Sequence, residues 1–186
     1  MKKALLIAAV AASASMPSLA SDTYFALELF GGQYDFSGKN GDTVKKIDDM
    51  GGFALKVGHY LNQNVRAYGY GQIAVSDEYN HIGFYQREVG AGADYLHYVN
   101  DKFYLLAGGN LGYQKTTLEN DGANPFKVDN SGISAGANLG LGYKFTDNFG
   151  MELGYRYNHY FSNEIKEANV NVDGSNVAYL NANFAF

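Results

Sequence analysis

The chain has 186 residues, which is enough for one domain with a hydrophobic core. It carries 19 acidic and 14 basic residues, no cysteine, and a net charge of −5 at pH 7. An acidic chain without a basic stretch argues against nucleic acid as a partner. The absence of cysteine is compatible with export to an oxidising compartment.

The N-terminus has the layout of a secretory signal peptide. Two lysines precede an apolar run from Ala4 to Ala12, and small residues follow up to Ala20. The run is too short to cross a bilayer, which takes roughly 18 apolar residues. We therefore predict that residues 1–20 are cleaved, rather than forming a buried helix, and that no lipid anchor follows because the chain has no cysteine. The remaining segment, residues 21–186, has 12 basic and 19 acidic residues, a net charge of −7.

Eight segments of this mature chain alternate apolar and polar residues with a period of two, which predicts β-strands. In chain order they are residues 24–36, 52–61, 65–75, 86–98, 102–114, 133–145, 149–161 and 177–186. The clearest runs from Ile133 to Phe145, where seven apolar or aromatic residues alternate with Ser, Gly, Asn and Lys. The last, VAYLNANFAF, ends in mid-strand on Phe186. No stretch of ten or more residues has helical periodicity.

The connections between these segments alternate in length. Short turns at residues 62–64, 100–101 and 146–148 alternate with polar stretches at 37–50, 76–85, 115–132 and 162–176. This alternation is typical of an up-and-down barrel, and eight strands would bring both termini to the short-turn rim. We find no domain boundary, linker, helical repeat or low-complexity tract.

The long polar stretches carry charges of both signs. Acidic runs such as Glu119-Asn120-Asp121 lack the ordered spacing of a calcium loop. His59, His81 and His97 are scattered along the chain and form no ligand set. The sequence therefore predicts no metal site and no cofactor, and leaves the ligand of the loops open.

The polar face of the strands indicates an enclosed lumen. It consists mostly of Gly, Asn, Ser, Ala and Tyr, with isolated charges at Glu28, Lys56, Arg66, Glu88, Asp94, Glu152 and Arg156. A water-soluble eight-stranded barrel, such as a lipocalin-like carrier, would also alternate, but its water-facing side could carry charges at most positions. Small residues with a few charges favour a narrow interior, with the apolar face toward lipid.

An eight-stranded barrel has an interior just wide enough for side chains to fill. Because unpaired charges are costly there, we predict a paired polar network of Glu28, Lys56, Arg66, Glu88, Glu152 and Arg156. Such a network would plug the lumen. The alternative is a gate or a narrow ion leak.

The predicted signal peptide, the eight segments, GMELGYRYNHY and the closing YLNANFAF resemble the small OmpA-like outer-membrane β-barrel family of Gram-negative bacteria. The resemblance covers the whole mature chain. It implies an all-β fold, an eight-stranded antiparallel up-and-down transmembrane β-barrel, in the outer membrane with periplasmic termini. Outer-membrane lipid and lipopolysaccharide would surround it, and we expect a monomer. The chain stops where larger relatives append a peptidoglycan-binding domain, so cell-wall anchoring is not expected.

The resemblance also implies a role for the last strand. In this family a terminal Phe in an alternating last strand is read by the outer-membrane assembly machinery. Tyr179, Phe184 and Phe186 match that signal, whereas Asn181 stands where a Gly is often expected.

Catalysis has one candidate site. Some small outer-membrane barrels are lipid A deacylases that use His and Ser with an acid, and His159, Ser162 and Glu164 in the HYFSNE stretch resemble that set. Residues three apart on a strand point to opposite faces, so only a bulge at Tyr160 or Phe161 would align His159 with Ser162. We therefore expect a non-enzymatic protein that serves envelope integrity or surface interaction through its long loops.

Overall fold

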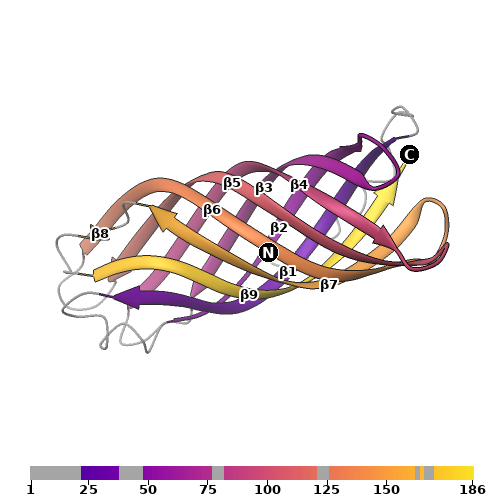
Figure 1. Ribbon diagram of the computed structural model, residues 1–186. Helices are drawn as coiled ribbons and strands as arrows, with labels where there is room; N and C mark the ends of the chain where they lie inside the picture. Colours follow the sequence, from indigo (N-terminus) through magenta and orange to yellow (C-terminus); the bar gives the residue numbers. More distant parts are fainter. Residues whose placement is uncertain (1–21, 38–47, 77–81, 121–125, 162–163, 166–169) are drawn as a thin grey trace.

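The computed structural model describes residues 22–37, 48–76, 82–120, 126–161, 164–165 and 170–186. They form one antiparallel sheet that closes into an elongated barrel of tilted strands (Figure 1). The strands are β1 (Thr23–Ser37), β2 (Asp49–Tyr60), β3 (Val65–Ser76), β4 (Ile82–Tyr98), β5 (Phe103–Asn120), β6 (Phe126–Lys144), β7 (Phe149–Phe161), β8 (Glu164–Ile165) and β9 (Val170–Ala185). Each long strand pairs with the next, and β9 pairs with both β7 and β1. The predicted eight-stranded up-and-down barrel is confirmed, with the two-residue β8 as an addition beside the start of β9.

The two faces of the strands are as predicted. The apolar face points outward, and its side chains are widely exposed, for example Leu139 at 67%, Leu111 at 65% and Val89 at 63%. The polar face points inward, where Glu28 and Glu152 are almost completely buried. Outward positions from Val89 to Tyr95 in β4 and from Phe103 to Tyr113 in β5 carry only Val, Ala, Gly, Leu, Phe and Tyr. Within the part of the chain that the structure describes, no helix is long and apolar enough to span a membrane.

Three short turns define one end of the barrel, which we call the short-turn end. In each turn a polar side chain accepts two backbone N–H bonds: Asn62 from Asn64 and Val65, Asn100 from Lys102 and Phe103, and Thr146 from Asn148 and Phe149. These local bonds fix each turn without help from the rest of the barrel. The described chain ends also meet here, because the Phe186 N–H donates to the Thr23 carbonyl at 3.0 Å.

Several strands are longer than predicted toward the opposite end. The polar stretch 115–132 predicts a loop, but β5 continues to Asn120 and β6 begins at Phe126. Likewise, β4 begins at Ile82 and β9 at Val170, inside stretches predicted as loops. In these extensions apolar side chains such as Phe84, Leu118 and Val172 point inward, so the pattern of outward apolar residues that predicted the strands stops early.

Polar pairs across β5 and β6 stabilise this extension instead. Lys115 Nζ lies 2.6 Å from Asp129 Oδ2, and the Thr117 hydroxyl donates to Asp129 Oδ1 at 2.7 Å. These two contacts lower the pKa of the exposed Asp129 carboxyl from its usual value. Lys127 pairs with Glu119 one step further along the hairpin. Cross-strand pairs of this kind stabilise a sheet whether or not one face is apolar.

An aromatic row surrounds part of the barrel on its outer face at the short-turn end. The rings of Phe103, Tyr143, Phe145, Phe149 and Phe184 follow one another with centroids 5.0 to 5.6 Å apart. They come from β5, β6, β7 and β9 and from the turn after β6, so the row crosses four neighbouring strands. Aromatic girdles at the rims are typical of transmembrane barrels.

Candidate functional site

The first charged cluster of the lumen is centred on Arg66 of β3. Its guanidinium donates two hydrogen bonds to Glu152 of β7, at 2.7 and 2.9 Å, and two to Asp94 of β4, at 2.9 and 2.8 Å. Glu152 also accepts bonds from the Tyr104 hydroxyl at 2.6 Å and the Asn181 amide at 3.0 Å. Bidentate arginine–carboxylate contacts are among the strongest polar contacts in proteins, so this cluster ties β3, β4, β5, β7 and β9 together across the interior.

The second cluster is centred on Glu28 of β1. Its carboxylate lies 2.5 Å from Lys56 Nζ on β2 and 2.8 Å from Arg156 Nη1 on β7. Arg156 in turn donates to the Gln72 amide oxygen at 3.3 Å. Both cations also lie over the Tyr179 ring, with Lys56 Nζ at 5.5 Å and the Arg156 guanidinium carbon at 5.7 Å from its centroid. The negative charge of the buried Glu28 carboxylate is therefore compensated by two cations, Lys56 and Arg156.

Glu88 of β4 has a different environment. Its carboxylate accepts hydrogen bonds from the Tyr70 hydroxyl at 2.5 Å, the Ser134 hydroxyl at 2.8 Å and the Gln72 amide at 3.1 Å. All three donors are neutral. Among the described residues, no lysine or arginine lies within ion-pair distance of this carboxylate.

Tyrosines lie flat against glycines inside the barrel, which explains why the polar face is so rich in Gly. Five tyrosines each face a glycine directly across a strand pair: Tyr24–Gly58, Tyr68–Gly92, Tyr70–Gly90, Tyr104–Gly142 and Tyr179–Gly154. A Cβ on any of these glycines would come within 2.6 Å of its tyrosine. Glycine thus gives each ring room to lie flat, and the hydroxyls of Tyr70 and Tyr104 donate to Glu88 and Glu152.

Two packed layers enclose the charged clusters along the barrel axis. Toward the opposite end, Phe30, Tyr34, Phe84, Leu118 and Tyr160 belong to a buried apolar cluster. Toward the short-turn end, Tyr60 packs against Tyr24 and Tyr98 packs against Tyr104, each with ring centroids 5.3 Å apart.

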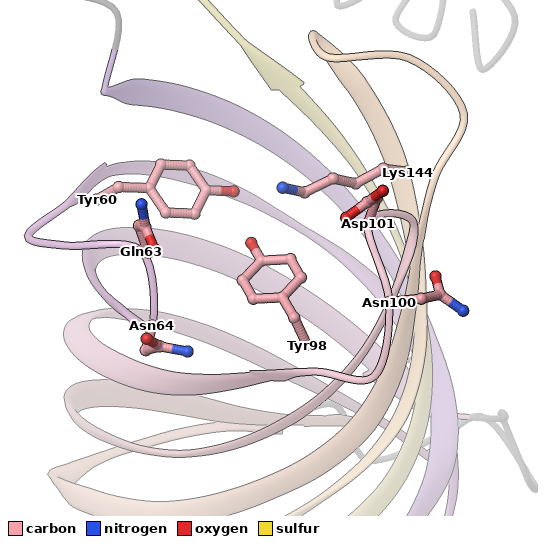
Figure 2. Close-up of a pocket in the computed structure, with 7 residues that line it drawn as sticks. All are labelled: Tyr60, Gln63, Asn64, Tyr98, Asn100, Asp101 and Lys144. Atoms are coloured by element: carbon pink, nitrogen blue, oxygen red, sulfur yellow. The ribbon is translucent and has the colours of Figure 1, made fainter.

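A cavity of about 630 Å³ opens at the short-turn end. It lies on the outer side of the layer formed by the Tyr24–Tyr60 and Tyr98–Tyr104 pairs. Figure 2 shows the Tyr60 and Tyr98 hydroxyls and the Lys144 ammonium pointing into this mouth. The remaining lining residues are Gln63, Asn64, Asn100 and Asp101. Lys144 Nζ lies 4.4 Å from the centre of the Tyr98 ring. The cavity is the mouth of the barrel, and its floor consists of the tyrosines that pack over the Arg66 cluster.

The structure places all six predicted network residues in the interior: Glu28, Lys56, Arg66, Glu88, Glu152 and Arg156. It brings Glu28 together with Lys56 and Arg156, and Glu152 with Arg66, but it leaves Glu88 apart. The sequence reasoning missed the neutral partners Tyr70, Gln72, Tyr104, Ser134 and Asn181. Each lies on the inward face of its strand, so strand alternation could have found them.

The candidate catalytic residues are not brought together in the described part of the chain. His159 is on the outer face, exposed, with its ring 4.6 Å from that of Phe161. Ser162 lies outside the described residues, as does Asn163, and only the backbone of Glu164 is described. The pairing of β7 with β6 stays in register through Tyr160 and Phe161, so the required bulge is absent from this pairing. No group of three or more His, Cys, Asp or Glu side chains could hold a metal in the described chain.

The three residues of the predicted assembly signal are distributed over both faces of β9. Tyr179 points inward against Gly154, and Phe184 belongs to the outer aromatic row. Phe186 follows β9 and pairs through its backbone with Thr23. Recognition of these residues by an assembly machinery stays a prediction, as does the signal peptide, which lies outside the described residues.

Known proteins with similar structures are small barrels of bacterial surfaces. Neisserial surface protein A superposes with a TM-score of 0.67 at 18% identity, covering 88% of this chain and 97% of that one. Outer membrane protein H from Pseudomonas aeruginosa gives 0.58 at 25% identity, covering 89% and 99%. The attachment invasion locus protein of Yersinia pestis gives 0.55 at 17% identity, covering 90% and 100%. A search among curated protein sequences finds no significant match.

The family described as "Outer membrane protein beta-barrel domain" matches residues 4–186, which is nearly the whole chain. This match agrees with the closed barrel, the apolar outer face and the polar interior. The chain therefore belongs to the outer membrane protein β-barrel domain family, as the resemblance of its sequence implied.

Proposed function

We propose that this protein is a non-enzymatic outer-membrane barrel with a closed lumen, and that it serves envelope integrity or surface interaction through its loops. The observation that carries the proposal is the filling of the interior. Two charged clusters are internally paired, and a packed layer lies on each side of them. An eight-stranded barrel has little space beyond its side chains, so the two paired clusters and the packed layers act together as a plug.

We further propose that the short-turn end faces the periplasm and the opposite end faces the cell exterior. Short periplasmic turns and longer external segments are typical of outer-membrane barrels. In this orientation the β5–β6 hairpin, with its exposed Lys115, Glu119, Lys127 and Asp129, extends toward lipopolysaccharide and external partners. The barrel would act as a monomer, since it pairs all its long strands internally.

The closed lumen predicts little steady conductance in a planar lipid bilayer. The purified, refolded protein should insert without opening a stable channel, because ions would have to displace paired charges and the packed tyrosines. A large-lumen porin reconstituted in the same bilayer is the positive control. A large and reproducible open channel from this protein would contradict the proposal and favour the ion-leak alternative.

The non-enzymatic assignment predicts that lipid A stays unmodified. Mass spectra of lipid A from cells that express the protein should match those from cells that express His159→Ala. The exposed His159 has an aromatic neighbour in the described chain, Phe161, rather than an orienting acid. If an acyl chain were lost with the intact protein alone, the protein would be an enzyme, and Ser162 would have to approach His159.

A further inference from the structure

Glu88 is the carboxylate that leaves the lumen electrically unbalanced. It is 2% exposed, and its hydrogen-bond donors are all neutral. The buried charged side chains of the described interior comprise four carboxylates and three cations: Glu28, Glu88, Asp94 and Glu152 against Lys56, Arg66 and Arg156. The three cations contact the other three carboxylates. A buried negative charge without a positive partner is costly, so Glu88 requires compensation.

An unsatisfied oxygen lies next to Glu88. The Asn110 side chain is 8% exposed, and its amide oxygen has no hydrogen-bond partner. Its amide nitrogen donates to the Tyr70 hydroxyl at 3.2 Å, and that hydroxyl donates to Glu88. The amide group that carries the free oxygen is therefore linked to the unbalanced carboxylate through two hydrogen bonds, with the Tyr70 hydroxyl between them. Leaving a buried acceptor without a partner costs free energy, and a ligand that accepts its lone pairs would recover that cost.

Two glycines form the floor beneath these oxygens. A Cβ on Gly112 of β5 would lie within 2.7 Å of Glu88 Oε1, Ser134 Oγ and the Tyr70 hydroxyl oxygen, so the three converge above one backbone position. On the neighbouring level of β6, a Cβ on Gly136 would lie within 2.6 Å of the amide oxygens of Asn110 and Asn158. A side chain at either position would collide with these oxygens, so the two glycines allow the oxygens to gather inside the barrel.

We propose that these oxygens bind one small monovalent cation, such as Na⁺ or K⁺, beside Glu88. Carboxylate, hydroxyl and amide oxygens are the ligands that hard cations prefer. One positive charge balances the single excess carboxylate, whereas a divalent ion would leave an excess positive charge in the interior. The Glu88 carboxylate would supply the charge, and Tyr70, Ser134 and Asn110 would supply neutral oxygen ligands.

The cation site goes beyond the proposed closed lumen and can fail independently of it. An open channel in planar bilayers would overturn the closed lumen without affecting cation binding in micelles. The absence of cation binding would overturn the site while the lumen stayed closed.

Thermal unfolding in detergent micelles tests the site. The midpoint should be higher in NaCl or KCl than in N-methyl-D-glucamine chloride of equal ionic strength, because a ligand that binds only the folded state stabilises it. The bulky organic cation does not fit a filled lumen. Glu88→Gln keeps the shape of the side chain but removes its charge, so its midpoint should be the same in all three salts. Glu119→Gln, which changes an exposed carboxylate on β5, should keep the wild-type response.

Sodium NMR tests cation binding directly on the wild-type protein, so its result does not depend on whether Glu88→Gln folds. The ²³Na resonance should broaden in the presence of the refolded protein and sharpen when K⁺ is added in excess. Equal unfolding midpoints of the wild type in all three salts would overturn the proposal.

Discussion

Replacing Arg66 with methionine is expected to lower the free energy of unfolding by about 3–5 kcal/mol, the range for breaking a buried ion pair from one side. The side chain of Arg66 is 2% exposed, and its guanidinium holds both Glu152 and Asp94. Methionine fills similar volume but leaves two carboxylates buried near each other without a cation. Tyr104 and Asn181 still donate to Glu152, but neutral donors do not cancel its charge.

Denaturation by urea in lipid vesicles, followed by tyrosine fluorescence and by gel mobility of folded and unfolded barrel, would measure this loss. Arg87→Met is the matched control, since Arg87 lies on the outer face, where its guanidinium donates to the Tyr85 hydroxyl. Exposed substitutions of this kind usually change stability by no more than about 0.5 kcal/mol. Adding Asp94→Asn and Glu152→Gln to Arg66→Met should restore most of the loss. Equal, small effects of Arg66→Met and Arg87→Met would mean that the cluster contributes little to stability.

Leu139→Arg is expected to lower the free energy of unfolding by about 2–4 kcal/mol, which is the cost of placing a cation on the lipid face near the bilayer midplane. Leu139 is 67% exposed and lies at the middle of the outward face of β6, between Ala107 and Tyr155 on the neighbouring strands. The long arginine side chain would have to reach the interface from the centre of the apolar band. The free energy of folding into liposomes, measured by urea titration, gives the effect directly.

Leu61→Arg is the control that distinguishes the effect of membrane depth from the effect of introducing an arginine in place of a leucine. Leu61 is 62% exposed but lies in the turn between β2 and β3, at the short-turn end. Near the interface the same change should cost only about 0–1 kcal/mol. A negligible cost at Leu139, or equal costs at both positions, would mean that residue 139 does not face mid-membrane lipid.

The amino-acid sequence alone determined the strands and their faces. Alternation predicted residues 149–161 as a strand, and β7 has these bounds. It also placed Arg66, Glu152 and the other charged residues on the face that became the interior. Side-chain direction alternates along any extended backbone, so this information is local and can be read from one strand at a time.

The closure of the barrel decided which of these residues meet. Arg66 and Glu152 are 86 positions apart and come from strands that are not neighbours, so their contact depends on the registers of every strand pair around the ring. The same registers set Tyr24 opposite Gly58, place Asn110 beside Tyr70 and leave Glu88 without a lysine or arginine partner among the described residues. The extensions of β5 and β6 likewise depend on pairs such as Lys115 with Asp129, which form only when the two strands are aligned. Alternation assigns each residue to a face, but only the closed ring of registers assigns it a partner.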